Sequence, residues 1–219
     1  ALETLENAAV FDAVRANPDV GLVGEVADAY REENCDGLVA LGGGSSMDVA
    51  KLVALLAHPD CAQSLQDIYG VGNAKGQRLP LIQVPTTAGT GSEATRFTII
   101  TDETSDEKML CAGLGFMPIA ALIDYELTLS LPPRVTADTG IDALTHATEA
   151  FVSVYANDYT DGLCLHAIKL IFENQGDGMA GVQAANSFVE DRVREHPVDW
   201  FWVHRRWPDK VYAALDRQA

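Results

Sequence analysis

The chain of 219 residues carries 32 Asp and Glu against 15 Lys and Arg, a formal net charge of −17. Such an acidic chain is not expected to bind nucleic acid, because phosphate backbones select basic surfaces. Although 47% of the residues are hydrophobic, no apolar run approaches the ~18 residues of a membrane span, and no secretory signal is apparent. The four cysteines lack CxxC spacing, so we expect a soluble cytoplasmic protein with reduced thiols and no membrane association.

The first half of the chain predicts helices alternating with strands. Apolar residues at helical spacing predict an amphipathic helix within 18–34, and the apolar run 35–41 predicts a buried strand entering a glycine-rich turn. Ser45 stands three residues before Asp48, a capping pattern that places a helix start at this serine. The helix is expected to continue through Leu56.

Further strands are expected at three places along the chain: 79–85, 97–101 and 119–124. Pro132 and Pro133 are expected to stop regular structure. Beyond them, apolar periodicity predicts helices over 136–155 and 160–173. The sequence therefore predicts an α/β domain that leads into an α-helical one.

The loop Gly42–Asp48 lies between a predicted strand and a predicted helix. Glycines allow close backbone approach, and the amide N–H groups of a helix start favour a phosphate. The loop departs from G-x-G-x-x-G, since Met47 replaces the third glycine, and no P-loop lysine follows. An ordinary tight turn between strand and helix would explain the glycines equally well.

A second loop, Pro85–Glu93, offers Thr and Ser hydroxyls on a backbone punctuated by glycine. This composition suits hydrogen bonds to ribose and phosphate oxygens. Lys108 lies beyond the strand predicted at 97–101 and could pair with a nucleotide phosphate, although a lone lysine is more often a solvated surface residue. Two such loops, each after a strand, together indicate a nucleotide site.

Asp142 and His146 stand four residues apart in a predicted helix. Residues at this spacing share one helical face and could hold a single metal ion, although most such pairs are solvated contacts. A carboxylate with an imidazole suits Fe²⁺ or Zn²⁺ better than Ca²⁺. His58 and His166 have no partner at ligand spacing and are interpreted as structural.

Five segments occur in the order GGGSSMDVAK, PTTAGTGSE, ITDETSDEK, ALIDYELTLSLPP and TGIDALTHATEAFVS. Over about residues 8–174 this series closely resembles the iron-containing (group III) alcohol dehydrogenases. The resemblance implies a Rossmann-like NAD(P)-binding domain with an incomplete N-terminus at 1–131, and the start of a helical metal-binding domain at 132–175. It also implies hydride transfer between NAD(P) and a small alcohol or aldehyde.

Carried over by position, the resemblance places the pyrophosphate on Gly43, Gly44 and Ser45, with Asp48 at the helix start. Asn17 would lie near the adenosine, and Lys108 would contact the cofactor. The nicotinamide side would be lined by five consecutive residues: Thr86, Thr87, Ala88, Gly89 and Thr90.

The resemblance matches Asp142 and His146 to the first two ligands of the family's catalytic metal, Fe²⁺ or Zn²⁺. The family takes two more histidines from downstream helices, and nothing after His146 matches them. The acidic residue that helps choose between NAD and NADP is also missing. The metal shell is therefore half present, and nucleotide preference stays open.

The remaining 44 residues form a different tail, and all three tryptophans lie within it. Its segment 190–210 resembles the end of lipid A biosynthesis lauroyl-type acyltransferases, whose catalytic body is missing here.

The sequence thus predicts a truncated or fused dehydrogenase. The alternatives are an inactive nucleotide-binding fragment, or a fusion whose 176–219 tail serves as an interaction or membrane-surface element. Apolar surface exposed by truncation would favour a homo-oligomer.

Overall fold

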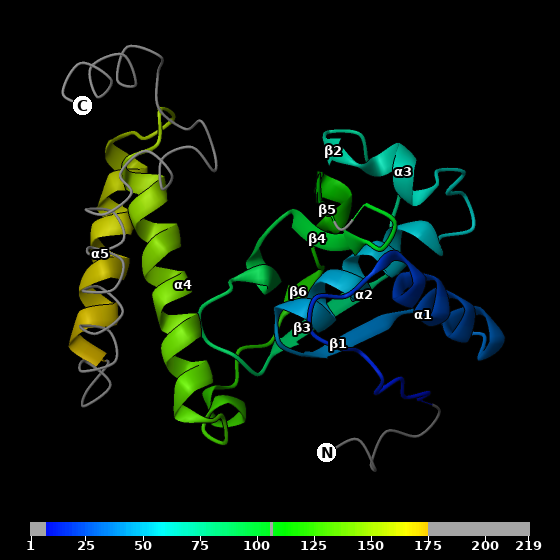
Figure 1. Ribbon diagram of the computed structural model, residues 1–219, viewed down its shortest axis with the longest axis horizontal. Helices are drawn as coiled ribbons and strands as arrows, with labels where there is room; N and C mark the ends of the chain where they lie inside the picture. The colour runs from blue at the N-terminus through cyan, green and yellow to red at the C-terminus, as the bar shows by residue number, and fades with distance from the viewer. Residues whose placement is uncertain (1–7, 106, 175–219) are drawn as a thin grey trace. The chain divides into compact units, whose positions relative to one another are not determined.

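The computed structural model describes residues 8–105 and 107–174, and the chain divides into two compact units, 1–130 and 131–219. The first unit has an α/β fold (Figure 1). Its longer helices are α1 (Val20–Glu32) and α2 (Gly44–Leu56). The predicted tail and its three tryptophans lie outside the described residues.

One sheet of the first unit is parallel throughout and has the order β1-β3-β6. Its strands are β1 (Leu38–Gly42), β3 (Leu81–Pro85) and β6 (Ala120–Ala121). The strand expected over 119–124 is thus only two residues long. Gly42 pairs with Pro85, so β1 and β3 end at the same level.

The other sheet has the order β2-β5-β4 and mixes both directions. The strand β2 (Gly70–Val71) runs parallel to β5 (Glu107–Ala112), whereas β4 (Phe97–Asp102) pairs with β5 in an antiparallel hairpin. The sequence analysis did not predict β5. Lys108, which lies beyond the strand predicted at 97–101, is part of β5. The short helix α3 (Leu65–Ile68), with its Ser64/Asp67 capping box, was missed as well.

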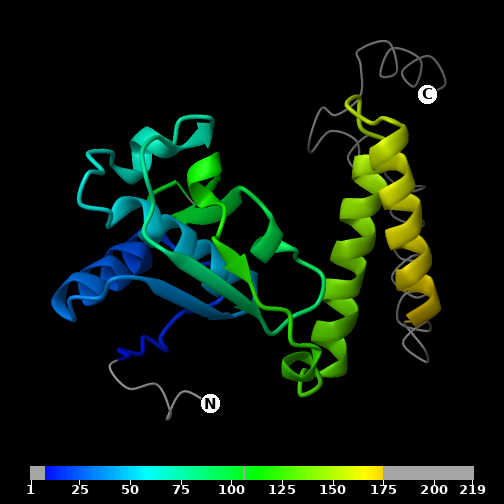
Figure 2. The ribbon, with the colours of Figure 1, turned by 180° about the vertical axis from the view of Figure 1, so that it is seen from behind.

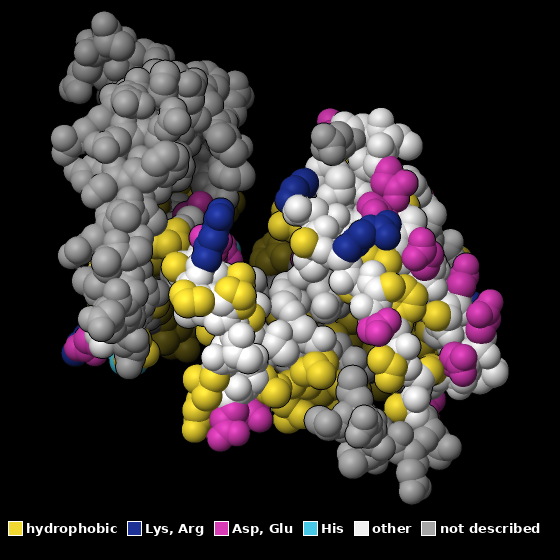
Figure 3. All heavy atoms as spheres, turned by 60° about the horizontal axis from the view of Figure 1, so that its bottom comes forward, with side chains coloured by type: hydrophobic (Ala, Val, Ile, Leu, Met, Phe, Trp, Pro, Cys, Tyr) yellow, Lys and Arg dark blue, Asp and Glu magenta, His cyan; other side chains and the backbone are white. Residues whose placement is uncertain are grey.

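The core of the first unit forms around α2, which has the most apolar sequence and whose side chains from Val49 to Leu55 are all buried. Helix α2 contacts α1, β1, β3 and β4, and Figures 1 and 2 show α1 beside α2. The opposite face of β1 exposes Val39 and Leu41, and Figure 3 shows apolar side chains gathered there. Within the described residues of the first unit, α2 covers one face of the parallel sheet, and the other face of β1 carries exposed apolar side chains.

The described residues of the first unit also form three short 3-10 helices: η2 (Ser92–Ala94), η3 (Leu114–Phe116) and η4 (Tyr125–Thr128). The described part of the second unit is a helical hairpin of α4 (Pro133–Phe151) and α5 (Asp158–Asn174), which pack against each other. Pro133 does not stop regular structure as expected but begins α4. A proline fits the first helical position because the N–H it lacks would be unpaired there anyway.

No described helix is both long enough and apolar enough to cross a membrane.

The fold predicts different effects for two neighbouring residues of η3. Phe116 is fully buried, whereas Leu114 is mostly exposed. We expect Phe116→Ala to lower the free energy of unfolding by about 3–5 kcal/mol, because it leaves a cavity beside α2. Leu114→Ala should change it by less than about 0.5 kcal/mol. Urea unfolding followed by circular dichroism measures both, and equal losses would contradict this packing.

Candidate nucleotide site and partial metal site

The two glycine- and threonine-containing loops meet at one edge of the parallel sheet. The first follows β1 and the second follows β3, and the register of these strands brings the loop starts side by side. The Thr86 N–H donates to the Gly42 carbonyl at 2.9 Å, one step beyond the paired strands. The sequence predicted both loops, and the fold places them together.

The first loop leads into α2 through a turn that requires glycine. Gly42 has φ +155°, and a Cβ there would lie 2.6 Å from the Ser46 hydroxyl. Helix α2 begins at Gly44, and its N-cap Gly43 has no side chain to cap the helix. The predicted Ser45 cap is therefore wrong, because Ser45 already lies inside the first turn. The backbone N–H groups of this turn stay open to an external acceptor.

The second loop approaches the first so closely that a Cβ on either facing glycine would make a tight contact. A Cβ on Gly43 would lie 3.3 Å from the Thr87 methyl group, and one on Gly44 would lie 3.3 Å from the Thr90 methyl group. Thr87, Thr90 and Gly44 are all half-buried. The two loops thus form a cradle with a bare backbone on one side and threonine hydroxyls on the other.

Three buried side-chain oxygens in or beside the two loops have no hydrogen-bond partner among the described residues: the Thr87 hydroxyl, the Gln83 carbonyl and Glu93 Oε2. Gln83 is fully buried on β3, and its amide nitrogen donates to the Met47 carbonyl in the first turns of α2 at 3.0 Å. Buried oxygens without partners are costly, so a ligand that pairs with them gains affinity. The Thr87 hydroxyl and the open N–H groups at the start of α2 can donate to phosphate oxygens, whereas the Gln83 carbonyl accepts only and would need a donor group of the ligand.

Asp48 lies in the second turn of α2 and is engaged within the chain. Its carboxylate accepts the Ser92 hydroxyl at 2.8 Å and the Ile99 N–H at 3.1 Å. Burial raises the pKa of this carboxyl, and the Ser92 hydrogen bond opposes the rise. Its predicted contact with the cofactor stays a prediction.

Lys51 is not among the residues that the sequence analysis singles out, although a lysine between Ala50 and Leu52 in an apolar helix signals a buried charge. It is fully buried, and its ammonium lies 3.8 Å from Asp48. Burial lowers the pKa of Lys51 to about 8, while the charges of Asp48 and Glu93 oppose this fall. The helix therefore carries a buried charged pair directly behind the cradle.

Asn17 and Lys108 are brought together from 91 residues apart. The Lys108 ammonium donates to the Asn17 side-chain oxygen at 3.0 Å. With Asp19, Thr101 and Glu103 they line an open cavity of about 400 Å³. Asn17 adopts a left-handed backbone (φ 52°), which asparagine tolerates better than most residues. The contact supports a shared role for these two residues.

Asp142 and His146 share one face of α4, as their spacing predicted. The carboxylate oxygen lies 3.6 Å from His146 Nε2, and the two side chains are 44% and 55% exposed. Among residues 8–105 and 107–174, no group of three or more His, Cys, Asp or Glu could hold a metal ion. The pair fits two ligands of a metal site but not a complete site.

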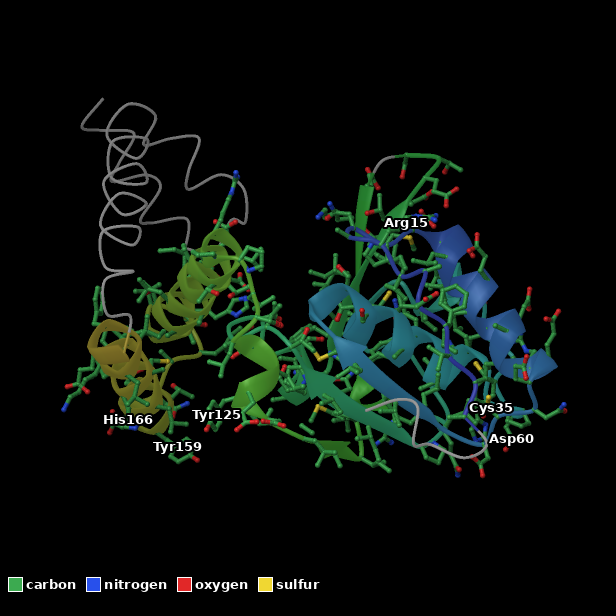
Figure 4. All side chains as sticks on the ribbon, turned by 90° about the horizontal axis from the view of Figure 1, so that it is seen from below. Arg15, Cys35, Asp60, Tyr125, Tyr159 and His166 are labelled. Carbon is green, nitrogen blue, oxygen red and sulfur yellow. The ribbon has the colours of Figure 1, made fainter. Side chains whose placement is uncertain are left out.

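The other two histidines among the described residues have structural or solvated settings. His58 accepts the Asp60 N–H at 3.2 Å in the turn after α2. His166 is exposed in the middle of α5, and Figure 4 labels it on this helix.

The fold and the cradle define an α/β protein whose loops gather at the carboxyl ends of parallel strands. The chain matches the family model for iron-containing alcohol dehydrogenase over residues 1–125, and the model for the C-terminal part of that family over 136–187. The chain therefore belongs to the iron-containing alcohol dehydrogenase family.

Among curated relatives, alcohol dehydrogenase 4 of Schizosaccharomyces pombe is 46% identical over 162 residues, which cover 74% of this chain and 38% of the relative. Choline dehydrogenase of Bacillus subtilis is 43% identical over 77% of this chain and 43% of its own length. The chain thus spans less than half the length of these relatives.

Solved structures agree with this fold. A 1,3-propanediol oxidoreductase superposes with a TM-score of 0.74 at 35% identity, covering 78% of this chain and 44% of the other. The sulfoacetaldehyde reductase of Bifidobacterium kashiwanohense, solved with NAD⁺, superposes with a TM-score of 0.69 at 40% identity. The match covers 75% of this chain and 44% of the reductase. The acyltransferase-like character of the tail rests on the sequence alone.

The buried lysine predicts a pH dependence of stability. Between pH 8 and 10.5 the unfolded chain keeps the Lys51 proton while the folded chain releases it. The unfolded state binds more protons in this window, so Lys51 raises the free energy of unfolding as the pH rises, by up to roughly 3 kcal/mol.

The measurement is the difference in unfolding free energy between wild type and Lys51→Met from pH 7 to 10.5. The pKa values of Tyr30 and Cys111 are raised by burial, but both groups are present in each protein and cancel in the difference. A flat difference would show that Lys51 is not buried as a charge.

Proposed function

We propose that this chain binds NAD(P) in the cradle formed by the two loops. One observation carries the proposal: an uncapped helix start and a threonine-bearing loop face each other at the shared end of β1 and β3. A helix N-terminus with free N–H groups at this edge is a general site for phosphate groups.

The pyrophosphate is assigned to Gly43, Gly44 and Ser45 at the helix start. The second loop supplies hydroxyl and backbone groups to the nicotinamide side through five residues: Thr86, Thr87, Ala88, Gly89 and Thr90. The Asn17–Lys108 pair contacts the cofactor beyond the cradle. The choice between NAD and NADP is not assigned.

We expect Thr87→Val to weaken NADH binding about three- to tenfold, because it removes a hydroxyl available to the ligand. The variant should not lose stability, since this hydroxyl has no partner among the described residues. Fluorescence titration with NADH measures the affinity, and thermal unfolding measures the stability.

Thr148→Val provides the control for this change. Thr148 is exposed on α4, and its hydroxyl donates to the Leu144 carbonyl. It should leave NADH affinity unchanged. Equal NADH affinity in wild type and Thr87→Val would remove Thr87 from the site, and a wild-type chain without NADH affinity would reject the nucleotide assignment.

We further propose that the protein transfers a hydride between NAD(P) and a small alcohol or aldehyde, with Asp142 and His146 as catalytic metal ligands. The support is membership of the family together with the shared helical face of this pair. A divalent metal, Fe²⁺ or Zn²⁺, would lower the pKa of a bound alcohol. With two ligands among the described residues, no reaction step is assigned to the metal.

A second candidate function is nucleotide binding without catalysis. The observation that favours it is the exposure of Asp142 and His146 without a third ligand in the described part of the chain. Two protein ligands hold a metal weakly, whereas catalytic sites commonly use at least three.

The two candidates differ in iron binding and turnover. If the metal site works, the full chain should bind about one Fe²⁺ in equilibrium dialysis and consume NADH with lactaldehyde. The double variant Asp142→Ala/His146→Ala should then reduce the affinity for Fe²⁺ and the rate of NADH consumption by about 100-fold or more, because it removes both of the assigned metal ligands.

The matched control is Arg134→Ala/Asp138→Ala, which removes another exposed pair at the same spacing on α4. This variant should bind iron and turn over like wild type. NADH binding without iron binding or turnover in the wild-type chain would support the second candidate.

The remaining assignments are proposals from the sequence. We propose a cytoplasmic protein that acts on a small molecule and not on nucleic acid or membranes. Exposed apolar residues such as Val39, Leu41 and Ile123 support self-association. The 176–219 tail is proposed as an interaction element, and failure to associate with liposomes in flotation would remove its membrane-surface version.

A further inference from the structure

Lys51 uses every proton of its ammonium group inside the first unit. Three oxygens at and beyond residue 92 accept hydrogen bonds from it: the Ser92 hydroxyl at 2.9 Å, the Thr95 hydroxyl at 3.1 Å and the Phe97 carbonyl at 2.7 Å. These acceptors lie 41, 44 and 46 residues further along the chain. One side chain of α2 therefore holds the whole segment from η2 to the start of β4.

Asp48 adds a second set of contacts from the same face of α2. The Ser92 hydroxyl accepts a hydrogen bond from Lys51 and donates one to Asp48, which also accepts a hydrogen bond from the Ile99 N–H. The Asp48 carbonyl accepts the Thr98 hydroxyl at 3.0 Å. The two side chains and this carbonyl together clamp residues 92–99 to the helix.

The clamp lies at the exit of the second loop. The entry of this loop is fixed by the Thr86 hydrogen bond to Gly42. Its exit passes through Gly91, which has a left-handed backbone (φ 62°), directly into Ser92. Residues 86–91 are thus fixed at one end by the sheet and at the other by Lys51 and Asp48.

Stability alone does not account for a lysine at this place. A buried charge costs desolvation energy, and apolar residues of similar volume often replace buried ion pairs with no loss of stability. A buried ammonium with three directed donors does, however, fix the positions of its acceptors far more narrowly than an apolar side chain could.

We propose that Lys51 is a positioning residue of the nucleotide site, which fixes the exit of loop 86–91 and thereby sets the affinity for the nicotinamide half of the cofactor. The inference rests on the proposed nucleotide function. The pyrophosphate is assigned to the first loop, whereas the contacts of Lys51 hold the exit of the second loop. We therefore expect loss of Lys51 to weaken the binding of NADH much more than the binding of ADP.

The test compares NADH and ADP binding by wild-type chain and Lys51→Met in calorimetric titrations. We expect NADH to bind about tenfold more weakly to the variant, and ADP within about twofold of wild type, because misplaced loop donors affect only the ligand that reaches them. Amide hydrogen exchange in the free variant should be faster across 86–97 than in wild type.

Two variants keep this comparison interpretable. Val23→Ala creates a defect in the core on α1, away from the clamp, and controls for a general loss of stability. It should leave both affinities unchanged. Ser92→Ala removes one acceptor of Lys51, and serves in place of Lys51→Met if that variant does not fold. Ser92→Ala should weaken the binding of NADH by about threefold and leave the binding of ADP unchanged.

The possible results distinguish failure of the Lys51 positioning role from failure of the proposed nucleotide binding. If wild type binds NADH and the clamp variants bind it equally well, the positioning role is wrong while nucleotide binding stands. An equal loss of NADH and ADP affinity also overturns it, since that result indicates a purely structural lysine. If wild type binds neither ligand, the proposed function fails and this inference fails with it.

Discussion

The parallel pairing of β1 with β3 is the constraint on which the rest of the candidate site depends. Both strands end at the same level, with Gly42 opposite Pro85, so the loops that follow them start side by side. The closeness of Gly43 to Thr87 and of Gly44 to Thr90 then follows from local geometry. A one-residue slip of this register would reverse the faces of every side chain on one strand and separate the loops.

Register alone does not determine where a six-residue loop goes after its first hydrogen bond. The chain fixes the far end of loop 86–91 with charged groups in its most apolar helix, where Asp48 and Lys51 stand one turn apart. Every donor and acceptor of this pair that reaches the segment 92–99 is matched, which limits the cost of burial. Burying this charged pair lowers the free energy of unfolding relative to an apolar pair, but it fixes the position of the far end of loop 86–91.

Much of this could be predicted from residue patterns, because the relevant signals are local. Apolar periodicity located α1, α2, α4 and α5, and short apolar runs before glycine turns located β1 and β3. The strand β5 was missed, since Glu107–Ala112 mixes charged and apolar residues and depends on β4 for its pairing. The Ser45 cap was wrong because a glycine one residue before the helix can adopt the extended backbone of an N-cap without a capping side chain.

The contacts that make the site specific are all long-range, and no local pattern contains them. The Lys108–Asn17 pair spans 91 residues, and the Lys51 clamp joins α2 to a segment more than 40 residues away. Tertiary pairing of this kind is set by the strand order and not by spacing along the chain. What the sequence does show is an anomaly, a lysine within an apolar helical run, whose burial requires partners from elsewhere.

The nucleotide cradle and the metal pair differ in how much of the fold each requires. A phosphate site needs backbone N–H groups at one helix start and one facing loop, and the first unit contains both. A tetrahedral metal site needs ligands that converge from several directions, whereas one turn of α4 supplies Asp142 and His146 from a single direction. The proposed nucleotide binding is therefore physically separable from completion of the metal site, because the loops of the first unit can form the cradle without a third metal ligand.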